Sequence, residues 1–91
     1  MGADTEILVE HIIGLNIIQR RYALDLQQQD LAAAVGLQLG EIRMIEAGLH
    51  PALARHLKVI ADQLRCTVDD LYCLPQNLHY ENSKKPKSVT S

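Results

Sequence analysis

The side chains best suited to chemistry in this chain of 91 residues are four histidines and two cysteines. Cys66 and Cys73 lack the two-residue spacing of a metal or redox pair, so two reduced thiols are expected. No glycine-rich phosphate loop or His-Glu-x-x-His motif is present. None of the gaps between the histidines matches a metal-binding helix: they stand at His11, His50, His56 and His79. The sequence therefore predicts a protein that is not an enzyme and that uses no metal or cofactor.

The elements that must position any binding residue are helical. Apolar residues make up 47% of the chain, which has no Trp and no Phe. The core must therefore be built from Leu, Ile, Val and Ala, which suits packed helices. Charged residues interrupt every apolar run before it reaches membrane-spanning length. Asp4 and Glu6 stand where a secretory signal would be basic, so we expect a cytoplasmic protein.

Apolar residues recur with helical periodicity and predict five helices. We expect Asp4 or Thr5 to cap the first helix and Thr67 to cap the last. Asp25 and Gln28 have the spacing of a capping box before the second helix. The expected spans are about 6–21, 27–35, 38–47, 52–65 and 68–74. In the fourth helix, the residues expected to face the core are Leu53, Leu57, Ile60, Ala61 and Leu64.

The composition changes after the fifth predicted helix. Residues 75–91 are polar and include two prolines, together with Lys84, Lys85 and Lys87. We therefore predict one domain over 1–74 and a flexible, basic tail over 75–91. The formal net charge is -2, so it becomes -5 when the charges of these three lysines are removed. The folded part is expected to be acidic.

The stretch from Gln28 to Gly48, QQDLAAAVGLQLGEIRMIEAG, has the pattern of two short helices joined by a tight turn. Gly36 and Gly48 can each adopt the left-handed conformation that ends a helix. Ile42 and Ile45 give the second of these helices an apolar pair on one side. A turn glycine between inward-facing apolar residues at this spacing is typical of helices that cross at a steep angle.

This stretch resembles the Cro/C1 (XRE) family of phage-repressor-like helix-turn-helix proteins. When Gln28 is the first motif position, Ala32 is the fifth, Gly36 the ninth, Ile42 the fifteenth and Ile45 the eighteenth. The segments LQQQDLA and IEAG are similar to the family's L-S-Q-E-E-L-A and I-E-x-G. The resemblance implies an all-α, five-helix, lambda-repressor-like domain. It also implies a DNA-binding transcriptional regulator, expected to be a repressor that reads an operator as a homodimer.

The resemblance also implies where double-stranded DNA would be contacted. The helix over 38–47 would lie in the major groove, and the family's glutamine at the position of Gln28 often binds phosphate and braces that helix. Leu39, Gly40 and Met44 occupy positions that commonly read bases, although none of them can form a bidentate hydrogen bond to a base. The family's glutamate at the position of Glu46 is structural. The predicted DNA-binding residues are Gln28, Gln38, Leu39, Gly40, Glu41, Arg43, Met44 and His50.

The adjacent arginines and the acidic charge of the folded part each allow two interpretations. Arg20 and Arg21 are either phosphate contacts or solvated surface residues. The acidic charge, the apolar readout positions and the unusually apolar first helix also fit a helix-turn-helix that binds protein instead of DNA, such as an antirepressor or a heterodimer partner of a related regulator.

The first helix is apolar around more than half of its circumference. It is either surrounded by its own domain or buried partly at a subunit interface, for which the C-terminal segment is the other candidate. Gly14 within this helix either weakens it or permits the close approach of another helix. The possible dimer-interface residues on this helix are Ile7, Ile12, Ile13 and Ile17.

Overall fold

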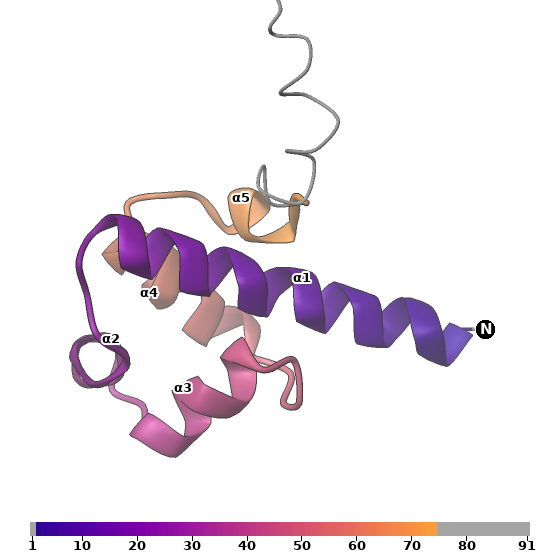
Figure 1. The fold of residues 1–91 in the computed structure, drawn as a ribbon, viewed down its shortest axis with the longest axis horizontal. Coiled ribbons are helices and arrows are strands. Elements are labelled where there is room, and N and C mark those ends of the chain that lie inside the picture. The colour runs from indigo at the N-terminus through magenta and orange to yellow at the C-terminus, as the bar shows by residue number, and fades with distance from the viewer. Residues whose placement is uncertain (1, 75–91) are drawn as a thin grey trace, which may run out of the picture.

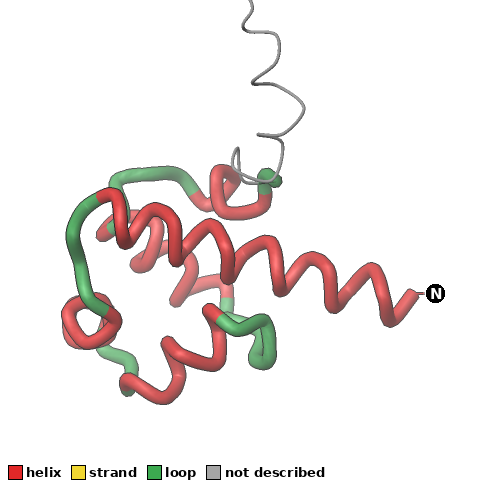
Figure 2. The backbone as a smooth tube through the Cα atoms, in the orientation of Figure 1, coloured by secondary structure: helices red, strands yellow, loops and turns green. Residues whose placement is uncertain are grey.

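The computed structural model describes residues 2–74, with side chains from Val9 onward, and the described part is helical without strands (Figure 1). Figure 2 shows the same helices connected by short loops. The helices are α1 (Gly2–Ala23), α2 (Gln28–Val35), α3 (Leu39–Glu46), α4 (Ala54–Gln63) and α5 (Val68–Tyr72). The all-α, five-helix prediction is confirmed. The predicted tail, 75–91, lies outside the described residues.

The bounds of all five helices differ from the predicted ones, by one residue at an end in α2 and α3 and by two or more in α1, α4 and α5. The first helix begins at Gly2, so Asp4 and Thr5 lie within α1 and do not cap it. The fourth begins two residues later than expected because Leu53 has an extended backbone, with φ -70° and ψ 151°. Leu53 therefore precedes α4 and is 52% exposed, and the prediction that it faces the core is wrong.

Each helix contributes one large, fully buried side chain to a single core. These side chains are Ile17, Leu31, Ile42, Ile60 and Leu71. The core lies where α1 packs against α3 and α5, and where α2 packs against α3 and α4. Full burial of such a side chain stabilises the fold by roughly 1.5–3 kcal/mol before conformational entropy is subtracted. The core therefore determines how all five helices pack.

The predicted turn glycines adopt the expected backbone conformation. Gly36 has a φ of 75° directly after α2, and Gly48 has a φ of 76° two residues after α3. In contrast, two residues with side chains also have left-handed backbones, Asp25 at φ 62° and Arg65 at φ 60°. Both stand in connections between helices, Asp25 before α2 and Arg65 before α5. These two turns thus carry a Cβ atom in a backbone conformation that favours glycine.

The cap predicted at the N-terminal end of α2 is wrong, whereas the cap predicted for α5 is confirmed. Asp25 lies in the left-handed turn, so the predicted capping box with Gln28 is wrong. The Asp30 carboxylate instead accepts a hydrogen bond of 3.0 Å from the Gln27 backbone N–H. At α5 the predicted cap is confirmed, because the Thr67 hydroxyl accepts a hydrogen bond of 3.1 Å from the Asp70 backbone N–H. None of the described helices combines the length and hydropathy needed to cross a membrane.

Gly14 lies where α1 crosses the end of α3. A Cβ atom at this position would stand 2.7 Å from the carbonyl oxygen of Ile45 and closer still to that of Glu46. Of the two interpretations of Gly14, the structure supports the close approach of another helix. α1 therefore packs directly on the backbone at the C-terminal end of α3.

Candidate nucleic-acid interface

The α2–α3 pair has the arrangement of a helix-turn-helix. The two helices pack against each other, and α3 lies at the edge of the domain (Figure 1). On α3, Ile42 and Ile45 are buried in the core. The predicted contact residues lie away from that core, with Leu39 and Glu41 partly buried and the others exposed: Gln38, Gly40, Arg43 and Met44. One side of α3 is thus available to a large partner such as DNA.

The C-terminal end of α3 is attached to α1 by a buried ion pair. Arg21 Nε donates to Glu46 Oε2 at 2.8 Å, and Arg21 Nη2 donates to Glu46 Oε1 at 3.1 Å. The Glu46 hydrogen bonds raise the pKa of Arg21 above its ordinary value, which is already high. Both side chains are almost completely buried. The two predictions for Arg21, a phosphate contact or a solvated residue, are therefore wrong, because its guanidinium belongs to the interior.

Gln28 extends this ion pair to the exposed side of α3. Its Nε2 donates to Glu46 Oε1 at 2.8 Å. This bond turns the side-chain oxygen of Gln28, Oε1, outward. Oε1 accepts a long hydrogen bond of 3.4 Å from Arg43 Nε. The bracing role implied for Gln28 by the family is therefore present between α2 and α3. A phosphate contact by Gln28 stays a prediction.

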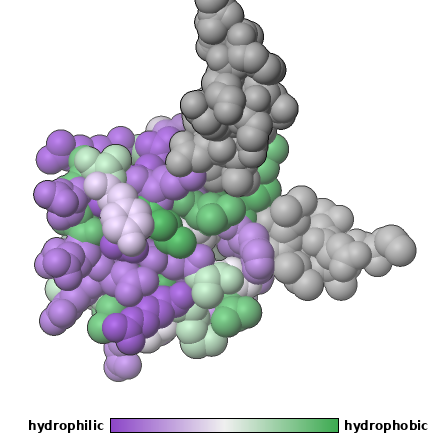
Figure 3. Space-filling view, in the orientation of Figure 1, coloured by the Kyte–Doolittle hydropathy of each residue, from purple (hydrophilic) through white to green (hydrophobic). Residues whose placement is uncertain are grey.

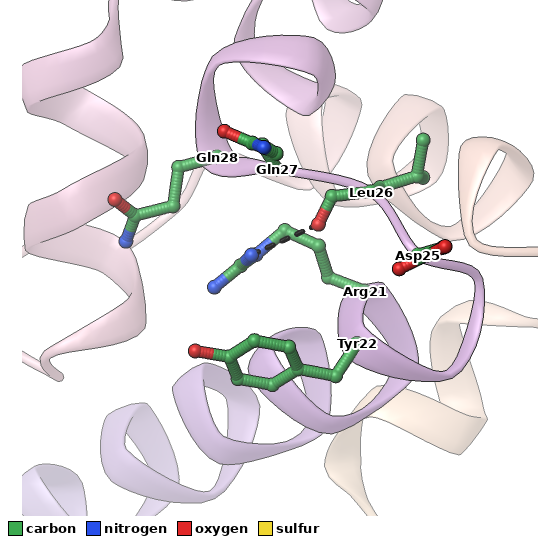
Figure 4. Close-up of a pocket in the computed structure, with 6 residues that line it drawn as sticks. All are labelled: Arg21, Tyr22, Asp25, Leu26, Gln27 and Gln28. Carbon is green, nitrogen blue, oxygen red and sulfur yellow. Dashed lines mark hydrogen bonds between the residues drawn. The ribbon is translucent and has the colours of Figure 1, made fainter.

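A hollow of about 430 Å³ opens beside this network, at the N-terminal end of α2. Figure 4 shows that the Arg21 guanidinium lies between the Tyr22 ring and the Leu26 carbonyl, to which Nη1 donates at 3.0 Å. The guanidinium carbon stands 4.8 Å from the centre of the Tyr22 ring. Since Glu46 already neutralises Arg21, the hollow offers polar contacts but little net positive charge. The other residues that line it are Asp25, Gln27 and Gln28.

The loop after α3 is exposed and mostly uncharged. Leu49 is 69% exposed and His50 is also exposed. Gly48 is covered by the imidazole of His11, and a Cβ at Gly48 would collide with that ring. Any phosphate contact from this loop would have to come from backbone N–H groups or from His50. Met44, 46% exposed on α3, continues the uncharged surface of the loop.

The predicted dimer residues on α1 separate into different environments. Ile13 is 7% exposed and Ile17 is fully buried, so both belong to the domain core. The prediction that they form a subunit interface is wrong, because side chains enclosed by their own domain cannot contact a second one. Ile12 is partly buried, and the side chain of Ile7 lies outside the described residues.

Sequence reasoning missed two buried polar residues on α1, Asn16 and Arg21. Asn16 is 5% exposed, and its amide donates to the carbonyl oxygens of Leu71 and Cys73. Arg21 follows Ile17 by four residues, so the helical period already placed it on the core side. Its spacing of four residues from Ile17 could therefore have predicted that Arg21 is buried. Its partner, Glu46, could not be identified from spacing because the two residues come from different helices.

Comparison with known proteins supports the assignment of α2 and α3 as a helix-turn-helix. The model of a family described as Helix-turn-helix (HTH_3) matches residues 17–71. Among solved structures, the clp gene regulator ClgR from Corynebacterium glutamicum is similar, with a TM-score of 0.67 and 16% sequence identity. The match covers 90% of this chain and 82% of ClgR, and at this identity it concerns the fold. No curated protein matches the sequence significantly.

Proposed function

This chain belongs to the Cro/C1-type (XRE) helix-turn-helix family of DNA-binding transcription regulators, and we propose that it is a cytoplasmic repressor that binds a two-fold operator as a homodimer. The observation that supports this most is the polar network from Arg21 to Arg43. It fixes α2 against α3 and leaves Arg43 on the exposed side of α3. Repression would follow from occupation of DNA that the polymerase needs.

In the proposed complex, α3 enters the major groove. Arg43 and Gln38 are the side chains able to hydrogen-bond to base edges or nearby phosphates, and Leu39 can contact a thymine methyl group. Gln28, at the start of α2, would contact the phosphate backbone beside the groove. His50 is the corresponding candidate on the loop after α3. Two copies would place two α3 helices one helical turn apart on the operator.

Binding to the DNA upstream of the protein's own coding region tests this proposal. Fluorescence anisotropy at about 50 mM and about 200 mM salt should show an affinity that falls as salt rises, because bound counterions are released. A full-length variant with Lys84→Ala, Lys85→Ala and Lys87→Ala should still bind. The proposal fails if the wild-type chain binds no DNA at low salt. Loss of all binding in the triple variant would assign the affinity to the tail and not to α3.

A second candidate function is binding to another regulatory protein through the same side of the domain. Two observations favour it: Met44 is 46% exposed and Leu49 is 69% exposed, beside a helix with a single cation, Arg43. An apolar surface of this kind suits a protein partner. The anisotropy measurement of DNA binding discriminates the two candidate functions, because protein binding in place of DNA binding predicts no DNA complex at low salt. In that case Leu49→Asp should release a partner that copurifies with the wild-type chain.

A further inference from the structure

The exposed side of α3 is apolar along its centre. Gly40, Met44 and Ala47 follow one another at intervals of four and three residues, so they lie on one side of the helix. All three are exposed, and this side is turned away from the core, because the buried residues Ile42 and Ile45 occupy the opposite one. We call Gly40, Met44 and Ala47 the outer strip of α3.

The outer strip leaves room for a partner to come close to the helix. A Cβ atom at Gly40 would have no neighbour within 4 Å. Met44 is the large side chain of the strip and is 46% exposed. In Figure 3 the lower edge of the domain, where Figure 1 places α3 and the loop after it, carries hydrophobic residues beside strongly hydrophilic ones. The strip thus presents one apolar side chain beside an open backbone.

The charged side chains beside the strip are directed by hydrogen bonds within the domain. Glu41 Oε1 accepts a hydrogen bond of 3.1 Å from the Gln38 backbone N–H, which turns the carboxylate toward the start of α3. Arg43 Nε donates to Gln28, which leaves the Nη groups of Arg43 without a hydrogen-bond partner among the described residues. These groups can donate to the O6 and N7 acceptors that guanine presents in the major groove.

The chemistry of the strip restricts which base it can recognise. Its side chains carry no hydrogen-bond donor and no strong acceptor, so they cannot pair with the polar groups of a base edge. Among the four bases, thymine is the one that presents a methyl group in the major groove, beside its O4 acceptor. An apolar strip in this groove therefore distinguishes thymine from the other bases through the methyl group.

The size of the strip favours a base edge over a protein partner. A standard protein interface takes about 20–30 residues from each side. The strip offers one large side chain, and even with Leu49 on the following loop there are two. The neighbouring Arg43 is charged, which suits a groove bordered by phosphates better than an apolar protein surface.

We propose that Met44 is a specificity-determining residue that packs against a thymine methyl group, next to a guanine contacted by Arg43. The inference rests on the proposed function and adds which bases the operator half-site contains. The hydrogen bonds of Arg43 fix the position of α3 along the groove, and Met44 then discriminates thymine from the other bases. The half-site that the protein selects from a random-sequence pool should therefore contain thymine beside guanine.

Replacement of thymine by deoxyuridine tests this inference on the full-length chain, because uracil pairs as thymine does and lacks only the methyl group. The probes are two fluorescent duplexes of the selected fragment, one with thymine and one with deoxyuridine at every thymine position of the half-sites. Wild-type protein should bind the deoxyuridine duplex about fourfold more weakly for each methyl group that Met44 covers, as expected for one buried carbon group. In Met44→Ala the difference between the two duplexes should largely disappear.

Leu74→Ala is the matched control, because Leu74 is 48% exposed and follows α5, which Figure 1 places on the other side of α1 from α3. This variant should keep the wild-type preference for thymine. Equal wild-type affinities for the two duplexes, or a thymine preference that survives Met44→Ala, would overturn the inference and leave DNA binding by the protein standing. If wild-type protein selects no fragment at all, the proposed function fails and this inference fails with it.

Discussion

Arg21 and Glu46 stand twenty-five residues apart in the sequence, and their side chains meet in a buried pair with two hydrogen bonds, of 2.8 Å and 3.1 Å. The pair joins the last turn of α1 to the last residue of α3. It also sets the direction of Gln28, which donates to the same carboxylate and accepts from Arg43. The position of the exposed Arg43 side chain thus depends, through Gln28, on the buried pair of Arg21 and Glu46.

Removal of one member of this pair should destabilise the domain strongly. Glu46→Gln leaves the Arg21 guanidinium buried without its counter-charge, so urea unfolding should show a loss of about 3 kcal/mol. The double variant Arg21→Met with Glu46→Leu should recover much of this loss, because neither charge remains buried. A Glu46→Gln protein within about 0.5 kcal/mol of wild type, the range of ordinary surface substitutions, would contradict the role assigned to the pair.

Two glycines should respond oppositely to the same substitution. Gly14→Ala places a methyl group 2.7 Å from the Ile45 carbonyl oxygen, so it should lower the free energy of unfolding by about 1–3 kcal/mol. Gly40→Ala meets no atom within 4 Å and should raise it by about 1 kcal/mol through helix propensity. Thermal unfolding of the two variants beside wild type checks both signs. Equal shifts would mean that α1 and α3 are not in backbone contact at Gly14.

The helix-turn-helix core was predictable because its determinants are local. Gly36 and Gly48 stand where left-handed turns are needed, and Ile42 and Ile45 follow the helical period. Asp25 and Arg65 escaped prediction since nothing in a single sequence marks a left-handed residue that has a side chain. The Arg21–Glu46 pair escaped because its members come from separate helices. The two misassigned interface residues, Ile13 and Ile17, show that an apolar pattern alone does not tell core from interface.

Arg65 should be a site where glycine stabilises the protein. Its φ of 60° is unfavourable for a residue with a Cβ by about 1–2 kcal/mol, part of which the unfolded-state entropy of glycine offsets. Arg65→Gly should therefore raise the free energy of unfolding by up to about 1 kcal/mol. Lys58→Gly, at an exposed position inside α4, should instead lower it by about 1 kcal/mol. A loss of stability in Arg65→Gly would contradict this, because it would show that contacts of the Arg65 side chain stabilise the protein by more than its left-handed backbone destabilises it.

The cap of α5 should make stability depend on pH in the acid range. The Thr67 backbone N–H donates to Asp70 Oδ2 at 2.9 Å, and this bond, helped by the Thr67 side chain, lowers the pKa of Asp70. A lowered folded-state pKa stabilises the domain above the ordinary value of about 4, and the effect is lost as pH falls through the lowered value. Asp70→Asn should therefore reduce the melting temperature at neutral pH, and the difference from wild type should vanish in acid.

Asp69→Asn is the control for this effect, because Asp69 shares the first turn of α5 and its favourable position in the helix dipole. It should change the melting temperature less than Asp70→Asn at neutral pH. If both variants behave alike across the range, the helix dipole and not the Thr67–Asp70 cap is responsible.

The measurement that tests the central claim most directly compares two arginines on the DNA fragment that wild-type protein selects. Arg43 is exposed on α3, whereas Arg65 is exposed in the turn between α4 and α5, which Figure 1 places on the other side of α1. Arg43→Ala should weaken binding to this fragment at least fivefold, as expected for the loss of about 1–3 kcal/mol of base contact, and weaken binding to unrelated DNA less. Arg65→Ala, which removes the same charge, should change both affinities little. Equal losses for the two variants, or selective binding that survives Arg43→Ala unchanged, would contradict DNA recognition by α3.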